Sequence, residues 1–76
     1  MENLRLFVLP NCPYCNKVRN YLEDKDFNVE IVDVNVPENQ DELMRVGGQD
    51  MVPCLFIDGK PLYESSDIIQ WFKDRE

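Results

Sequence analysis

With 76 residues, the chain has room for one small hydrophobic core, so we expect a single domain over residues 1–76. Its net charge of −7 would repel a phosphate backbone, and nucleic acid is therefore not an expected partner. No apolar run approaches the ~18–20 residues that cross a bilayer, and no secretory signal is evident. We expect a cytoplasmic protein that does not bind membranes.

The first expected strand, Leu4–Leu9, leads directly into a Cys-x-x-Cys motif. The strand is short and mostly apolar, and Pro10 and Asn11 mark its end. Pro13 suits the first position of a helix, because its missing N–H is one that the helix could not use. Cys12 is therefore the expected N-cap, where free backbone N–H groups and the helix dipole favour a thiolate.

The two cysteines of the motif are close enough in sequence to form a disulfide, so we expect Cys12 to attack and Cys15 to resolve. The expected helix, Pro13–Lys25, should bury one face, formed by Tyr14, Cys15, Val18, Tyr21 and Leu22. Cys15 should then be the more buried cysteine. The alternatives are two buried thiols or half of a zinc site, but zinc needs four ligands and the chain has no histidine. Redox chemistry is favoured, and no metal site is expected.

The middle of the chain predicts a second strand and a short helix. Phe27–Val36 is rich in Val and Ile and should pair in parallel with the first strand, because a helix lies between them. Asn39 is followed three residues later by Glu42, a helix-capping pattern, and Gly47-Gly48 marks the end of this helix. Its expected apolar side consists of Leu43, Met44 and Val46. Its expected solvated side consists of Asp41, Glu42 and Arg45.

The last part of the chain predicts a hairpin and a third helix. Met51–Ile57 and Lys60–Tyr63 should form two strands around Asp58-Gly59, a typical two-residue turn. Pro61 lacks a backbone donor, so the second of these strands should lie at an edge of the sheet. The segment Glu64-Ser65-Ser66-Asp67 is typical of a helix start and precedes an amphipathic run.

The order strand, helix, strand, helix, hairpin, helix resembles glutaredoxin over nearly the whole chain. Cys12-Pro13-Tyr14-Cys15 matches the dithiol signature of that family, and Val52-Pro53 lies where the family has its cis-proline. The resemblance implies an α/β protein with a minimal thioredoxin fold, a four-stranded mixed sheet with three helices in the order β-α-β-α-β-β-α. It also implies that the backbone of Val52 pairs with the cysteinyl part of glutathione.

The resemblance implies a glutathione site at the third helix. Compared with glutaredoxin, the contacts to the γ-glutamyl end would come from Ser66 and Asp67. The segment is also similar to the Glu-Ser pair of the glutathione transferase N-terminal domain, which would move them to Glu64 and Ser65. In both cases a helix start binds a carboxylate and an acidic side chain meets an amino group. The alternative is plain helix capping by Ser65. The expected glutathione-binding residues are Pro13, Tyr14, Gln49, Val52, Pro53, Glu64, Ser65, Ser66 and Asp67.

Two positions depart from the glutaredoxin pattern. Many members have Lys or Arg three residues before the first cysteine, where this chain has Leu9. They often have a basic residue before the Val-Pro pair, where this chain has Gln49-Asp50-Met51. Lys17 and Gln49 are candidates to replace these cations in holding glutathione. Cys54 lies in an apolar strand and is expected to act as a small buried hydrophobe.

The expected function is that of an enzyme, a thiol-disulfide oxidoreductase. It would reduce protein disulfides and glutathione mixed disulfides and be re-reduced by glutathione, as a monomer with no tightly bound cofactor. Its expected partners are glutathione and disulfide-containing or glutathionylated proteins. One alternative keeps the chemistry but takes electrons from a flavoprotein thioredoxin reductase. Others are a carrier in which two chains and glutathione hold a [2Fe–2S] cluster, and a domain that only binds.

Overall fold

The sheet at the centre of the molecule has four strands in the order β2-β1-β3-β4. A computed structural model describes residues 3–76 and gives the strands as β1 Leu4–Val8, β2 Val29–Asp33, β3 Cys54–Ile57 and β4 Lys60–Tyr63. β1 pairs in parallel with β2 and antiparallel with β3, and β3 pairs antiparallel with β4. The mixed sheet and its strand order along the chain are those expected from the sequence, and β4 lies at an edge.

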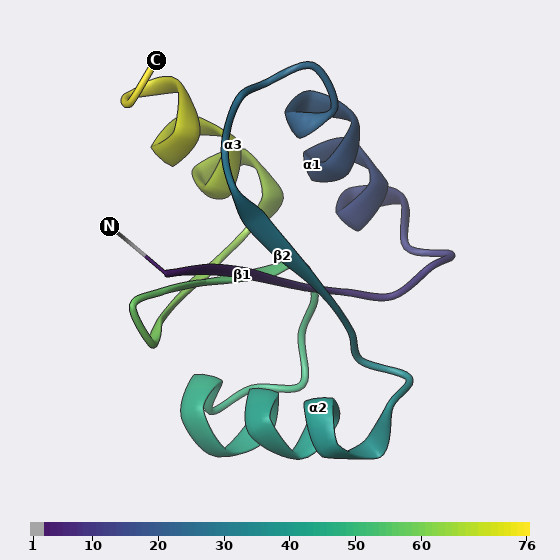
Figure 1. The fold of residues 1–76 in the computed structure, drawn as a ribbon. Coiled ribbons are helices and arrows are strands. Elements are labelled where there is room, and N and C mark those ends of the chain that lie inside the picture. The colour runs from purple at the N-terminus through teal and green to yellow at the C-terminus, as the bar shows by residue number, and fades with distance from the viewer. Residues whose placement is uncertain (1–2) are drawn as a thin grey trace.

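The helices cover both faces of this sheet (Figure 1). α1, Pro13–Leu22, and α3, Ser65–Lys73, lie side by side on one face. α2, Pro37–Glu42, lies on the other and continues into η1, a π-helical segment over Leu43–Gly47. Within residues 3–76 no helix combines the length and the apolar character that a bilayer span requires.

β1 is apolar except at Arg5, because its side chains are buried on both faces of the sheet. Leu4, Leu6 and Val8 belong to the core under α1 and α3, whereas Phe7 belongs to the core on the α2 side. The α1/α3 core also contains Cys15, Val18, Leu55, Ile68 and Phe72. The α2-side core also contains Val32, Val34, Leu43, Cys54 and Phe56. The two cysteines that follow Cys12 along the chain therefore lie on opposite faces.

The first two strands are shorter than the sequence predicts. β1 ends at Val8 rather than Leu9, and β2 covers Val29–Asp33 rather than Phe27–Val36. Val8 is in register with Asp33, and the ladder between the two strands ends at this pair. Hydrophobic patterning alone marks which residues favour a strand, but the register of the partner decides where pairing stops.

Two other element ends also differ from the expectation. β3 begins at Cys54 rather than Met51, because Pro53 has no backbone donor for the ladder. The Val52–Pro53 peptide bond is cis, as the resemblance implied. α1 ends at Leu22 rather than Lys25, where the chain tightens into a turn in which the Lys25 N–H donates to the Leu22 oxygen at 3.0 Å.

The second helix is the element that the sequence predicts least well. It begins at Pro37, with Val36 as its N-cap, so the expected cap at Asn39 is wrong. The Asn39 side chain instead donates to the backbone oxygen of Asp33 at 2.9 Å. The wider π-helical turn of η1 also breaks the expected apolar side. Leu43 is buried, whereas Met44 and Val46 are exposed.

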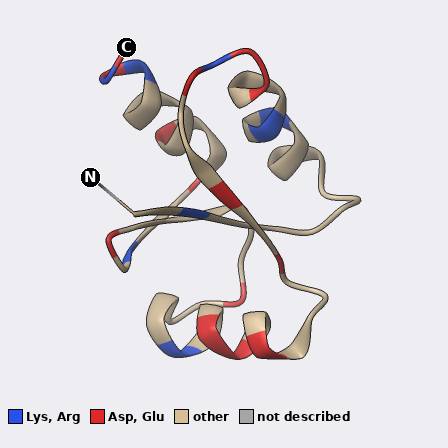
Figure 2. Ribbon diagram, viewed as in Figure 1, with Lys and Arg blue, Asp and Glu red and all other residues tan. Residues whose placement is uncertain are grey.

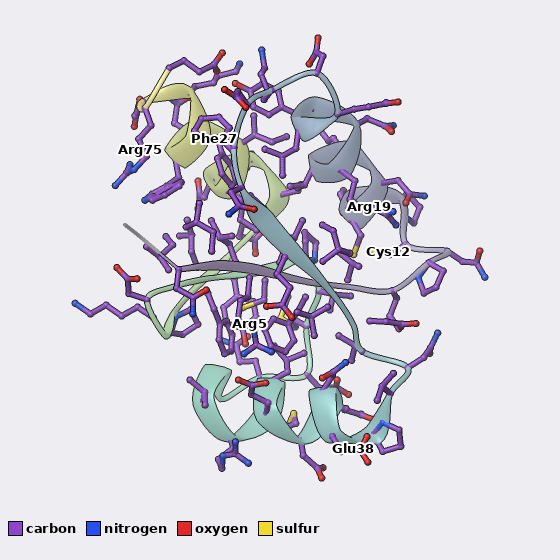
Figure 3. All side chains as sticks on the ribbon, in the orientation of Figure 1. Arg5, Cys12, Arg19, Phe27, Glu38 and Arg75 are labelled. Atoms are coloured by element: carbon purple, nitrogen blue, oxygen red, sulfur yellow. The ribbon has the colours of Figure 1, made fainter. Side chains whose placement is uncertain are left out.

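Acidic residues gather along α2, as Figure 2 shows. Glu42 does not lie on a solvated face as expected, because it forms an ion pair with Arg5 of the central strand. Arg5 also pairs with Glu30 of β2 at 3.3 Å, and Figure 3 shows it between the sheet and α2. The hydrogen bond to Glu42 raises the pKa of the Arg5 guanidinium, and burial lowers it. The net effect is a raised pKa.

Candidate active site

Cys12 caps the start of α1, as expected. Its backbone is extended, with φ −91° and ψ 116°, and its Sγ accepts a hydrogen bond from the Cys15 N–H at 3.3 Å. Pro13 takes the first helical position. The sulfur therefore lies at the positive end of the helix dipole, where negative charge is stabilised. Figure 3 shows Cys12 where the loop after β1 enters α1.

Cys15 lies one turn into the helix and is fully buried, whereas Cys12 is partly exposed. Both are free thiols. Burial, together with the neighbouring Cys12, raises the pKa of Cys15 to about 12. Cys15 is therefore a protonated thiol at neutral pH, and Cys12 is the accessible sulfur of the pair. This confirms the expected difference in burial between the two cysteines.

A cavity next to the motif, about 430 Å³ in volume, is lined by most of the expected glutathione-binding residues. It is lined by Tyr14, Lys17, Met51, Val52, Pro53, Tyr63, Glu64, Ser65 and Ser66. Tyr14 is 65% exposed there, so its expected place on the buried face of α1 is wrong. It lies in the first turn of α1 and lines the cavity, whereas the next residue, Cys15, packs in the core. Among the expected residues, Pro13, Gln49 and Asp67 lie outside this lining.

The wall of the cavity formed by Glu64, Ser65 and Ser66 includes the start of α3. Glu64 is the N-cap residue, with φ 72° and ψ 120°, a left-handed backbone region that costs a non-glycine residue on the order of 1–3 kcal/mol. Within residues 3–76 no side chain caps this helix start, so capping by Ser65, which is already inside the helix, is wrong. The first N–H groups of α3 border the cavity without an intrahelical acceptor.

The charged groups around this cavity are of both signs. Glu64 contributes a negatively charged carboxylate to its lining, and Lys17 contributes a positively charged ammonium group. Asp67 is in the first turn of α3 but is not part of the lining. A zwitterionic ligand with a carboxylate near the α3 start would therefore meet a positive helix end, an acid and an amine in one cavity.

Cys12 borders a separate, smaller cavity of about 260 Å³ with Leu9, Pro10, Asn11 and Asn35. The sulfur thus lies where a second molecule can approach it. Cys54 is fully buried on the other face of the sheet, and burial raises its pKa to about 11. Cys54 is therefore the buried hydrophobe that the sequence predicts. Residues 3–76 contain no group of three or more Cys, Asp or Glu side chains arranged to hold a metal ion.

Two lining residues, Met51 and Tyr63, were not among the sequence-predicted site residues. Met51 directly precedes the Val52-Pro53 pair, and this position in the sequence could have identified it as a residue of the site. Tyr63 directly precedes Glu64 and ends β4, at the point where the strand leads into the site. Lys17 was a candidate only as a replacement cation, and its place in the lining agrees with that role.

Comparison with known proteins connects this geometry to two groups of thioredoxin-fold proteins. The family model described as "Glutathione S-transferase, N-terminal domain" matches residues 6–76. A glutaredoxin-like 8.6 kDa protein from the rubredoxin operon of Clostridium pasteurianum is 36% identical over 59 residues, covering 74% of this chain and 76% of that protein. A four-stranded mixed sheet with three helices in this order is the minimal thioredoxin fold, as expected.

Two further similarities cover only part of a longer protein. The hybrid peroxiredoxin hyPrx5 of Haemophilus influenzae is 31% identical over 71 residues, covering 93% of this chain and 30% of that protein. The crystal structure of glutathione transferase Omega 3C from Trametes versicolor superposes with a TM-score of 0.85 at 26% identity, covering 96% of this chain and 33% of that one. The chain therefore spans about a third of these two proteins.

Proposed function

Because this glutaredoxin-like chain belongs to the glutathione S-transferase N-terminal domain family, we propose that it is a glutathione-dependent thiol-disulfide oxidoreductase acting through Cys12 and Cys15. One observation carries the proposal. The accessible Cys12 sulfur, at the start of α1, accepts a hydrogen bond at 3.3 Å from the backbone N–H of the buried Cys15. The substrates would be disulfide-containing or glutathionylated proteins, and the chain would act as a monomer.

In the proposed reaction, the Cys12 thiolate attacks one sulfur of a substrate disulfide. A bond forms between Cys12 and that sulfur, the substrate S–S bond breaks, and the leaving thiolate takes up a proton. Cys15 or glutathione then attacks the Cys12 sulfur and releases the second substrate thiol. When Cys15 does this, the two cysteines become a disulfide, and two molecules of glutathione return them to thiols while forming glutathione disulfide.

The pKa of Cys15 fits this order of events. Burial comes first among the causes that raise it to about 12, and the rest of the increase comes mainly from Cys12. While Cys12 is free, Cys15 therefore keeps its proton and does not compete as the nucleophile. Once Cys12 is part of a mixed disulfide, it can no longer carry a negative charge, so the part of the increase that comes from Cys12 is removed and the pKa of Cys15 falls.

The cavity beside the motif is where we place glutathione. Its volume of about 430 Å³ falls within the usual range for small-molecule sites. The γ-glutamyl carboxylate would accept from the backbone N–H groups at Ser65 and Ser66, and the backbone of Val52 would pair with the cysteinyl part. Lys17 is the cation that we assign to the glycyl carboxylate, in place of the basic residues that the chain lacks.

For the amino group of glutathione we assign Glu64 rather than Asp67. Glu64 lines the cavity and Asp67 does not. This favours the transferase-like alternative, in which Glu64 and Ser65 bind the γ-glutamyl end, over the glutaredoxin-like one with Asp67. It agrees with the family match over residues 6–76. The γ-glutamyl α-carbon carries both an ammonium group and a carboxylate. Glu64 would pair with the ammonium group, while the positive start of α3 would hold the carboxylate.

The hybrid peroxiredoxin suggests one class of protein substrate. A region similar to this chain forms about a third of a protein whose name describes it as a peroxiredoxin. We propose that an oxidised peroxiredoxin cysteine, present as a disulfide or glutathione mixed disulfide, is among the substrates of Cys12. The peroxide, and not this chain, would supply the oxidant.

The test is a side-by-side reduction of the oxidised protein by glutathione and by a thioredoxin reductase with NADPH. We expect the Cys12–Cys15 disulfide to be reduced by glutathione alone. Turnover only with the reductase would overturn the glutathione assignment and support the redoxin alternative. A brown dimer with visible absorption after anaerobic reconstitution with iron and sulfide would instead support a cluster carrier.

A further inference from the structure

Tyr63 lies between the two walls of the glutathione cavity. One wall is Met51–Pro53 and the other is Glu64–Ser66, and Tyr63 lines the cavity with both. Its ring packs against the core on the α2 side. Its hydroxyl donates a hydrogen bond to the backbone oxygen of Gln49 at 3.2 Å. Because Gln49 leads directly into the first wall, this bond ties the end of β4 to the segment before the cis-proline.

Gly47 approaches the same hydroxyl so closely that a side chain at this position would have to displace it. A Cβ at Gly47 would overlap the Tyr63 hydroxyl oxygen and would lie 3.4 Å from Leu43 Cδ1. Gly48 follows with φ 77°, in the left-handed region that favours glycine. The chain can therefore leave η1 and turn directly against Tyr63, which brings Gln49 within hydrogen-bonding distance.

The Tyr63 hydroxyl keeps its proton, and so remains a donor, at neutral pH. Cys54 is its cross-strand partner in the register of β3 and β4. Burial first, and then the neighbouring Cys54, raise the pKa of Tyr63 to about 12. The phenol is therefore protonated at neutral pH, and the bond to the Gln49 oxygen does not depend on any titration near that pH.

We propose that Tyr63 is a positioning residue for glutathione. Its hydroxyl fixes the Gln49–Pro53 segment relative to the start of α3, and so sets the separation between the Val52 backbone and the N–H groups at Ser65 and Ser66. Glutathione must reach both sets of groups at once, so this separation determines affinity. The inference rests on the proposed function.

The first test compares Tyr63→Phe with Tyr21→Phe. Each removes one hydroxyl that forms a hydrogen bond, but Tyr21 bonds to Glu76, away from the cavity. We expect the KM for glutathione to rise about two- to tenfold in Tyr63→Phe, the effect of one neutral hydrogen bond, and to stay unchanged in Tyr21→Phe. The rate of Cys12 alkylation by iodoacetamide should not change. A KM for Tyr63→Phe equal to that of the wild type would overturn the inference.

The second test places Gly47→Ala in the wild-type and Tyr63→Phe backgrounds. We expect the added methyl group to raise the KM in the wild type and to have a smaller effect when the overlapping oxygen is absent. Equal increases in both backgrounds would contradict the inference. If the wild type is not reduced by glutathione, the proposed function fails, and the effect of the Tyr63–Gln49 hydrogen bond can still be tested by hydrogen exchange of the Gly48 amide, which precedes Gln49 and donates to the Met44 oxygen at 3.0 Å. Tyr63→Phe should accelerate that exchange, and unchanged rates would overturn the inference independently.

Discussion

The starts of α1 and α3 have the same backbone physics but serve different groups. Each has free N–H groups and partial positive charge, and each contributes residues to the cavity of about 430 Å³ beside the cysteine motif. At α1, the chain's own Cys12 sulfur accepts a helix N–H. At α3, Glu64 adopts a left-handed backbone, and within the described residues no side chain caps the helix. The residue before a helix thus decides whether its start stabilises a nucleophile of the chain or remains open to the carboxylate of a ligand.

The largest expected effect comes from removing the nucleophile at the α1 start. Cys12→Ser should abolish reduction of every disulfide, because a serine hydroxyl is not ionised at neutral pH and forms no mixed disulfide. Cys15→Ser should keep activity on a glutathionylated peptide, since glutathione can resolve the intermediate. NADPH consumption coupled through glutathione reductase measures both variants. Equal loss in the two would mean that Cys15 is required at every turnover.

The next effect concerns selectivity between the two cysteines of α1. Iodoacetamide at pH 7, followed by mass spectrometry, should label Cys12 about a hundredfold or more faster than Cys15, because alkylation requires a thiolate. Burial and Cys12 keep the pKa of Cys15 at about 12, so its labelling should increase only as the pH rises toward that value. Cys54, with a pKa of about 11, should also remain unlabelled at pH 7. Faster labelling of Cys15 or Cys54 would contradict the assignment of Cys12.

At the α3 start, Ser65→Pro and Ser65→Ala separate the backbone N–H from the hydroxyl. Proline is tolerated at the first helical position, but it removes the N–H that we assign to the glutathione carboxylate. We expect the KM for glutathione to rise about ten- to a hundredfold in Ser65→Pro, since hydrogen bonds to a charged group contribute ~1.5–3 kcal/mol. Ser65→Ala should change it less. Similar KM values for the two variants would mean that the Ser65 N–H does not bind glutathione.

The smallest expected effect distinguishes the two acids at the same helix start. Glu64→Gln should raise the KM for glutathione about two- to fivefold, in line with the ~0.2–1 kcal/mol of an exposed ion pair. Asp67→Asn is the matched control and should raise it less, because Asp67 lies outside the cavity lining. A larger effect of Asp67→Asn would restore the glutaredoxin-type assignment of this segment.

Local sequence patterns were sufficient to predict much of the fold and the cysteine pair. The N-cap position of Cys12 and the burial of Cys15 follow from Pro13 and from helical spacing, both of which are properties of neighbouring residues. The ends of the strands did not follow, because they depend on the register with a distant strand. The pairing of Glu42 with Arg5 was missed because it joins residues that are far apart in the sequence. Tyr63 becomes recognisable as part of the site only when the fold brings Gln49 beside it.

The two outer strands of the sheet bear on how the protein behaves at high concentration. β4 contains Pro61, which interrupts the row of donors that another chain could use, whereas β2 carries Glu30 and Asp33 along its free edge. Two copies that joined through β2 would bring these carboxylates together, and the net charge of −7 adds a general repulsion. This protection is lost when carboxylates take up protons, so we expect the chain to stay dispersed at neutral pH and to aggregate in moderately acidic solution.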